Sequence, residues 1–576
     1  MRMKGSNFSN TQFLGRCIDQ ALGRIAADLV IRNTQFLDVI TGDLIRGDIA
    51  ICGDRIVGTC ESYTGTVEID GTDLTVVPGF IDTHVHCESS LVTPLEFDRC
   101  VLPRGTTTAI CDPHEIANVL GREGIEYFLR CAERTCMDLF VQLSSCVPAT
   151  DMETAGARLD AADLVSLRDH AKVIGLAEFM NYPGLLAKAP DVMEKLAAFQ
   201  GWHIDGHAPL VRGRELNAYL ACGICTCHET TSLEEAREKL RKGMHVLIRE
   251  GTVSKDLHTL APLLNPLTSN AMGFCTDDRN PLDIGEEGHL DFLIRTTIEL
   301  GIAPAEAYRA ATWSAARAFG LRDRGLVAPG KKADLVLLSN YENCDVHSVI
   351  SAGRLVNAEL FAAREPVASV GLASVKRQTV TEEDLRVTGQ APEIPVIGVK
   401  AGSIITEHRT LPVPLKQGAR VADAAADILK ICVLERHGRG GHIGRGFVQG
   451  FGIRQGALAS SVGHDSHNLC VVGSSDADMV VAANHLIKIG GGFAVALNGE
   501  ILADLPLPVA GLMSLEPYEK VREKLLVLRD TVRALGCPLP EPFLQLAFLP
   551  LPVIPHLKIT DRGLVDVDQF CFVEMS

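Results

Sequence analysis

The chain has 576 residues, of which 46% are hydrophobic, and its formal net charge is −17. That length predicts several domains, and the apolar fraction predicts several packed cores, which excludes a disordered protein. The negative charge argues against a partner whose phosphate backbone must be neutralised, so no nucleic-acid partner is expected.

The opening stretch, MRMKGSNFSNTQFLGR, is mildly basic but lacks the apolar core of a secretory leader. No uninterrupted apolar run reaches the roughly 18–20 residues that a membrane helix needs, so no membrane span is expected. The 18 cysteines are scattered through apolar stretches, which favours reduced thiols packed as small hydrophobic residues. These features together predict a cytoplasmic protein.

Residues 1–75 are predicted to form the first part of a small β-sandwich domain. From residue 24, short β-like runs are separated by glycine–aspartate turns, as in ITGD, IRGD and ICGDR. Residues 321–370 have the same texture, with turns at APGKKAD and SAGR. We therefore expect these two segments to pair into one domain that flanks whatever lies between them.

Residues 76–320 alternate short apolar runs with helix-like segments. Eight such units match a (β/α)8 barrel in number and size. A doubly wound sheet is the alternative, but it would not need eight strands spaced so evenly. The strand candidates are VVPGFIDTHVH, TTTAICDPH, LFVQLSSCV, KVIGLAEF, GWHIDGH, GICTCHE, HVLIRE and AMGFCTDD.

Residues 371–576 mix helices and strands. We expect helices at 421–437, 475–491 and 514–536, and strands within 493–508. The segment TVTEEDLRVTGQAPEIP reads as a linker into this unit. The predicted fold class is therefore α/β: a (β/α)8 TIM-type barrel with a small flanking β-sandwich domain and a C-terminal α+β domain.

The stretch PGFIDTHVHCESS ends the first barrel strand with two histidines. Residues i and i+2 of a strand face the same side, so His84 and His86 point together at the barrel face where active sites lie. Four other strand ends carry further ligand types. They are Glu178 on the fourth strand, His207 on the fifth, His228 on the sixth and Asp277 on the eighth.

Four histidines and two carboxylates at five strand ends predict a metal centre. Six ligands are more than one ion with an open position needs, so a carboxylate between two ions is the natural interpretation. Two neighbouring ions can share and activate one hydroxide.

Rival motifs are incomplete. His86-Cys87-Glu88 has no Pro-Cys-x-x-Cys partner, which the zinc signature of cytidine deaminases requires. HEIAN at His114 and HETTS at His228 lack the second histidine of H-E-x-x-H. ACGICTCHE has one C-x-x-C but no second pair, which favours a structural role for its cysteines.

Several segments together resemble the bacterial-type adenine deaminases of the amidohydrolase superfamily. The likeness extends to GRGFVQGFGIRQGALASSVGHDSHN and covers nearly the whole chain beyond its opening segment. H-x-H alone is typical of the whole superfamily, whereas the ESS, DPHE and EFMN extensions narrow the resemblance to the adenine deaminases. The segments are VVPGFIDTHVHCESS, CDPHEIANVLG, GLAEFMNYPG, DGHAP, HETTS and CTDDRNPLDIGEEGHLD.

The resemblance implies a hydrolase that converts adenine and water to hypoxanthine and ammonia, in purine salvage or adenine catabolism. One ion would be bound by His84, His86 and Asp277 and the other by His207 and His228, and Glu178 would bridge them where many superfamily members use a carboxylated lysine. Asp277 would also carry a proton from the attacking water to N1 of the ring. Fe(II) or Mn(II) is implied, and zinc is an alternative that these ligands also suit.

Other polar residues lie beside the ligands, and they either support the ligands or contact the purine edge. They are Glu88, Ser89, Ser90, His114, Glu115, Glu229 and Asp278. The segment GHDSHN, residues 463–468, either closes the barrel mouth or forms a structural hydrogen-bond cluster. An amidohydrolase acting on a cyclic amide and a non-catalytic metal-binding barrel are the competing functions, and the apolar third unit suggests a homo-oligomer.

Overall fold

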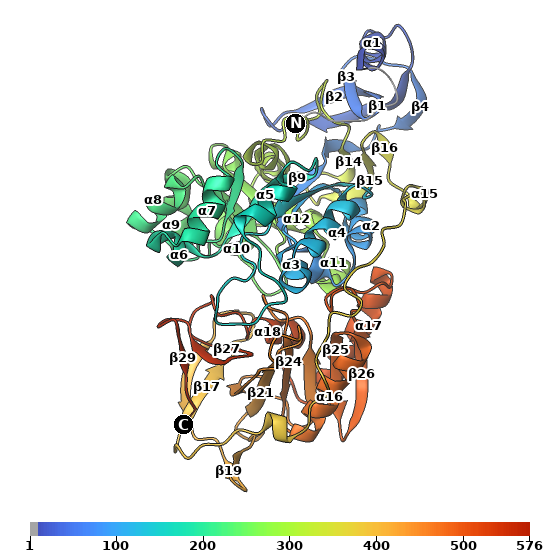
Figure 1. Ribbon diagram of the computed structural model, residues 1–576. Helices are drawn as coiled ribbons and strands as arrows, with labels where there is room; N and C mark the ends of the chain where they lie inside the picture. The colour runs from blue at the N-terminus through green and yellow to red at the C-terminus, as the bar shows by residue number, and fades with distance from the viewer. Residues whose placement is uncertain (1–9, 576) are drawn as a thin grey trace.

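The computed structural model describes residues 10–575 as three units that lie one above another (Figure 1). Residues 1–9, which hold more than half of the opening stretch considered above, and residue 576 lie outside the described residues. Among the described residues, no helix is long and apolar enough to cross a membrane. All 18 cysteines are described, and each is a free thiol.

The middle unit is a closed barrel of eight parallel strands, as predicted. Hydrogen bonds across two seams complete the ring: the amide of Cys225 donates to the carbonyl of Ile204 over 3.1 Å, and that of Asp277 donates to His84 over 3.0 Å. The strands are β6 (Phe80–Val85), β7 (Thr106–Cys111), β8 (Asp138–Leu143), β9 (Val173–Phe179), β10 (His203–Gly206), β11 (Thr226–Cys227), β12 (His245–Arg249) and β13 (Met272–Cys275).

Helices surround the barrel because each carries one apolar face. In α4, Ile125, Phe128 and Leu129 are buried, whereas Arg122 and Glu123 are exposed, which is the spacing of an amphipathic helix. The longer helices of this layer are α2 (Pro94–Val101), α4 (Arg122–Ala132), α5 (Ala161–Arg168), α7 (Pro190–Ala198), α8 (Gly213–Ala221), α9 (Leu233–Arg241) and α12 (Leu290–Glu299). Shorter ones are α3 (His114–Leu120), α6 (Tyr182–Ala187), α10 (Leu257–Leu260), α11 (Pro281–Glu286), α13 (Pro304–Arg309) and α14 (Ala315–Ala318).

The flanking unit is one sheet built from both sides of the barrel sequence. β14 pairs antiparallel with β5, with Leu335 opposite Pro78, so the two segments meet although the whole barrel separates them in the chain. Helix α1 (Asn10–Ala21) covers part of this sheet. The strands are β1 (Ala27–Leu37), β2 (Leu44–Cys52), β3 (Arg55–Thr59), β4 (Gly65–Asp70), β5 (Thr75–Pro78), β14 (Leu335–Asn340), β15 (Asp345–Ser351) and β16 (Arg354–Leu355).

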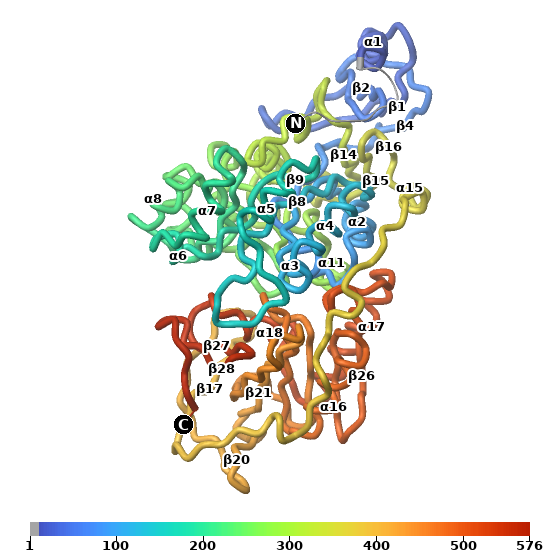
Figure 2. The backbone as a smooth tube through the Cα atoms, in the orientation of Figure 1, coloured from blue at the N-terminus to red at the C-terminus, as the bar shows by residue number. Residues whose placement is uncertain are grey.

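The third unit is reached by an extended connection. Figure 2 shows the backbone after α15 (Ala358–Ala362) running along the side of the barrel towards the lower unit. Its main sheet has the order β18-β17-β22-β21-β24-β23-β25-β26 and packs against α16 (Asp476–Ile489) and α17 (Tyr518–Ala534). The sheet strands are β17 (Ile394–Gly398), β18 (Glu407–Leu411), β21 (Ile428–Leu434), β22 (Ile443–Gln449), β23 (Ala457–Ser460), β24 (Leu469–Gly473), β25 (Gly492–Leu497) and β26 (Glu500–Pro506). Further elements are α18 (Pro542–Ala547), the hairpin of β19 (Leu415–Lys416) and β20 (Ala419–Arg420), and the small sheet of β27 (Leu557–Thr560), β28 (Gly563–Asp566) and β29 (Cys571–Val573).

The helix expected at 421–437 is wrong. Residues 428–434 instead form β21, which lies between β22 and β24 and is buried along its whole length. The alanines before it favour a helix, but Ile428, Ile431 and Val433 fit a strand that is covered on both faces. Pairing with two neighbours therefore overrides the local helix propensity. The helices expected at 475–491 and 514–536 are present as α16 and α17.

The third unit packs against the barrel end at which the strands terminate. The amide of Ser514 donates to the carbonyl of Leu91 over 2.7 Å, and the amide of Thr154 donates to the Asp561 carboxylate over 2.9 Å. A single apolar cluster includes side chains of both units, among them Leu282 and Leu525. Any pocket at the barrel mouth is therefore lined from two units.

Candidate metal centre and active-site pocket

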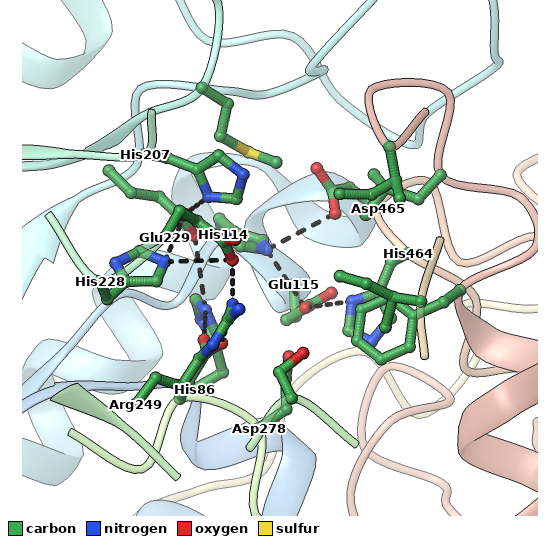
Figure 3. Close-up of a pocket in the computed structure, with 18 residues that line it drawn as sticks. His86, His114, Glu115, His207, His228, Glu229, Arg249, Asp278, His464 and Asp465 are labelled. Carbon is green, nitrogen blue, oxygen red and sulfur yellow. Dashed lines mark hydrogen bonds and ion pairs between the residues drawn. The ribbon is translucent and has the colours of Figure 1, made fainter. Parts of the chain in front are cut away.

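The six side chains predicted as metal ligands meet at one buried point. Carboxyl-terminal strand ends of a closed parallel barrel share one face, which is why residues far apart in the sequence come together. Figure 3 shows several of them directed towards a common pocket. They are His84 on β6, His86 just after it, Glu178 on β9, His207 after β10, His228 after β11 and Asp277 after β13.

Glu178 lies between two groups of histidines. Its Oε2 is 2.5 Å from Nδ1 of His207 and 3.3 Å from Nε2 of His228, and its Oε1 is 3.4 Å from Nε2 of His86. Oδ1 of Asp277 lies 3.2 Å from Nε2 of His86. Ligand atoms of His84, His86 and Asp277 all lie within 4.8 Å of one another, as do those of Glu178, His207 and His228. Each of these two groups could hold a metal ion, and Glu178 lies beside both.

The tautomers of His84 and His86 fit cation binding. Nδ1 of His86 faces the backbone carbonyl of Asp112 at 2.9 Å, and Nδ1 of His84 faces the Asp205 carboxylate at 3.0 Å. Both partners only accept hydrogen bonds, so each Nδ1 carries the proton and each Nε2 of a neutral ring has a lone pair. The two Nε2 atoms are 3.2 Å apart. Two lone pairs this close repel unless a proton or a metal ion lies beside them.

The electrostatics of the centre also favour positive charge. Burial opposes protonation of His84, but the Asp205 hydrogen bond and the Glu178 charge outweigh it and raise its pKa to about 9. Burial opposes ionisation of Glu178, but His207 and the other histidines hold the pKa of that carboxyl well below its usual range. A site that keeps a proton on a buried imidazole at neutral pH also suits a cation that replaces the proton.

Arg249 and its partners form a second layer that the sequence did not reveal. Its guanidinium donates to Glu229 and, over 3.2 Å, to Oδ2 of Asp277, and its Nε donates to Asp256 over 3.1 Å. Asp205 was also missed. Asp205 could have been found because it lies two residues before His207, and strand periodicity places residues two apart on the same side of the strand. Arg249 could have been found because it ends the seventh barrel strand.

The third unit contributes side chains to the pocket. His464 Nδ1 is 2.6 Å from Oε1 of Glu115, and Nε2 of His467 contacts the other oxygen of that carboxylate. Asp465 Oδ1 lies 3.7 Å from Nε2 of His114, whose Nδ1 is 3.2 Å from Glu178. Figure 3 shows His464 and Asp465 on the opposite side of the pocket from His207 and His228. The segment GHDSHN therefore lies at the barrel mouth and also takes part in a buried hydrogen-bond cluster. Its position at the mouth and its hydrogen bonding are two aspects of one arrangement.

The other predicted residues divide into two groups. Glu115, Glu229, His114 and Asp278 line the pocket. The remaining three lie outside its lining and support neighbouring groups: Ser89 bonds to Asp278, Glu88 accepts from the amide of Ile116 over 3.1 Å, and Ser90 donates to the carbonyl of Cys87 over 2.5 Å.

Comparisons with known proteins agree with this architecture. Residues 75–356 match the model of the amidohydrolase family, and residues 403–571 match that of the adenine deaminase C-terminal domain. The barrel, its histidine–carboxylate centre and the first match define the class as an amidohydrolase. Among solved structures, a triazine hydrolase variant aligns with 58% of this chain and 98% of its own, with 16% identity and a TM-score of 0.46.

Relatives that match along their whole length define the family. A protein named adenine deaminase from Gluconobacter oxydans is 63% identical over 97% of this chain and 99% of its own. Another from Sinorhizobium fredii is 61% identical over 98% of this chain and 100% of its own. A third, adenine deaminase 1 from Rhizobium meliloti, is 60% identical with the same coverage. The chain belongs to the adenine deaminase family.

Proposed function

We propose that the protein hydrolyses adenine to hypoxanthine and ammonia with two divalent cations held at the barrel mouth. The observation that carries the proposal is the convergence of four histidines and two carboxylates in one buried pocket. The substrate is inferred from the relatives, which are named for adenine deamination and match both the barrel and the third unit.

The side chains suit two divalent ions. In this proposal, His84, His86 and Asp277 would hold one ion, His207 and His228 would hold the other, and Glu178 would contribute to both. When bound, such ions supply Lewis-acid activation of water at neutral pH. Histidine nitrogens and carboxylate oxygens suit Fe(II), Mn(II) and Zn(II), and we propose Fe(II) or Mn(II) as the native metal.

In this proposal, Asp277 moves the proton that the reaction requires. Attack of water at C6 builds negative charge on the ring nitrogens, so N1 must gain a proton before ammonia leaves. Burial opposes ionisation of Asp277, but His86, His228 and Arg249 hold the pKa of its carboxyl well below the usual range. The carboxylate is therefore ionised, which it must be to accept a proton from water and pass it to N1.

The proposal is tested by preparing metal-free protein and adding back Mn(II), Fe(II) or Zn(II). Ammonia release and the absorbance change from adenine to hypoxanthine are then followed, and bound metal is counted by elemental analysis. We expect adenine turnover to rise with metal up to two ions per chain. Dihydroorotate and hydantoin serve as competing substrates, and turnover of either in preference to adenine would replace this function with cyclic-amide hydrolysis.

A further inference from the structure

The third unit supplies an apolar surface to the active-site pocket. Besides His464 and Asp465, four apolar side chains of this unit line the pocket, and five of the six proposed ligands line it from the barrel. The four apolar side chains, here called the roof, are Ile404, Phe548, Leu551 and Ile554. Phe548, Leu551 and Ile554 are buried in one small cluster with Met180 and Val253 of the barrel loops. The roof is thus packed against both units.

Lys558 on β27 hydrogen-bonds to the backbone of both loops that carry the roof. This lysine is fully buried, and its Nζ donates to the carbonyl of Ile404 over 2.8 Å and to that of Phe548 over 3.0 Å. Gln545 adds a third hydrogen bond, in which its side-chain amide donates to the carbonyl of Ser403 over 2.8 Å. The Phe548 ring also stacks on His464, with centroids 4.5 Å apart. The two loops that carry the roof are therefore fixed to each other and cannot readily withdraw from the pocket.

The roof has consequences for the shape and polarity of a ligand. The cavity measures about 370 Å³ including its part open to solvent, near the lower end of ordinary ligand pockets. Four hydrocarbon side chains offer no hydrogen bond to a ligand's hydroxyl groups. A buried hydroxyl that contacts only these four side chains lacks a partner, which is unfavourable.

The orientation of the base follows from the proposed function, on which this inference rests. C6 must face the ligand cluster for water to attack it, and N9 lies on the other ring of the purine, at the far edge from C6. We propose that the roof residues Phe548, Leu551 and Ile554 face that edge and restrict the enzyme to the free base by excluding any substituent on N9. Substrate selection is then a property of the third unit, whereas the chemistry belongs to the barrel.

The test compares adenine with 9-methyladenine, which carries the smallest carbon substituent at N9. The Mn(II)-loaded full-length protein is assayed as wild type, L551A, F548A and the milder I554V. We expect the wild type to deaminate adenine with a much higher kcat/KM than 9-methyladenine. In the roof variants, the ratio of kcat/KM for 9-methyladenine to that for adenine should rise roughly 10- to 200-fold. This is the range of discrimination that an apolar pocket achieves between substrates that differ by one carbon group.

Phe543→Ala is the matched control. Phe543 is a buried phenylalanine of α18, but it stacks on Phe493 beside a neighbouring cavity and does not line the active-site pocket. Its substrate ratio should stay at the wild-type value. Adenine turnover by roof variants without a rise in the ratio, or a wild-type kcat/KM for 9-methyladenine equal to that for adenine, would overturn the role of the roof alone. Failure of the metal-loaded wild type to deaminate adenine would overturn the proposed function and the roof with it.

Discussion

Asp277 combines two contacts in one carboxylate: Oδ1 faces His86, and Oδ2 accepts from Arg249. Its backbone is in the left-handed region, with φ of 51°, which asparagine adopts as readily as aspartate. Asp277→Asn should therefore keep the loop in place while removing the proton acceptor. We expect kcat on adenine to fall roughly 10²- to 10⁴-fold, with much of the metal retained, as measured by steady-state assay and elemental analysis.

Ser90→Ala provides the comparison for that variant. Ser90 lies in the same segment as the two strand-end histidines, but its hydroxyl bonds only to the carbonyl of Cys87 and does not line the pocket. Its turnover should stay within a few-fold of wild type, because the lost bond is local to one short turn. A loss as large as that of Asp277→Asn would mean that any change near the centre abolishes activity, and the proton-transfer role would lose its support.

Helix α9 connects two of the strand-end loops through one buried lysine. Lys239 donates to the carbonyls of Ala208 and Glu229, each over 2.9 Å, and to the Glu235 carboxylate over 2.8 Å. Those carbonyls follow His207 and His228 directly. Lys239→Met should loosen both loops and weaken metal binding at these histidines roughly 10- to 100-fold, as outer supports of metal ligands commonly do. Titration of metal-free protein with Mn(II) measures this change.

Lys242 ends the same helix and is the control for that substitution. Its side chain is half-buried, and its ammonium donates to Glu238 and to the carbonyl of Gly213, away from the centre. Lys242→Met should leave Mn(II) affinity at the wild-type value. Equal weakening by both variants would attribute the effect to general destabilisation of α9, and unchanged affinity in Lys239→Met would contradict the support role.

Across the whole molecule, local sequence patterns predict some parts of the fold and of the site but not others. The barrel was predictable because buried parallel strands read as short apolar runs, and strand ends such as Glu178 and Asp277 mark one common face. The strand β21 was not, because its pairing partners lie outside the local sequence. Arg249 ends a strand without being a metal-ligand type. The placement of His464 against Glu115 depends on how the third unit packs on the barrel, which no local periodicity records.

That same packing buries a carboxyl group between the two units. Glu541 begins α18 and accepts a hydrogen bond from Asn280 of the barrel over 3.2 Å, while Arg529 lies 3.7 Å away. Burial, reinforced by the charge of Asp283 and only partly offset by Arg529, raises the pKa of Glu541 from its ordinary 4.5 to about 7. The folded protein therefore holds more protons than the unfolded chain between these pH values, so this group makes stability fall as pH rises from about 4.5 to 7.

Glu541→Gln should remove that dependence, since its amide oxygen still accepts from Asn280 but never ionises. The free energy of unfolding of the variant should equal that of the wild type near pH 4.5. The variant should become increasingly more stable than the wild type up to about pH 7 and stay so above it, by at most about 3 kcal/mol. Urea unfolding at pH 5, 6, 7 and 8.5 measures the difference. A constant difference between Glu541→Gln and wild type across this range would show that Glu541 does not titrate at the interface between barrel and third unit.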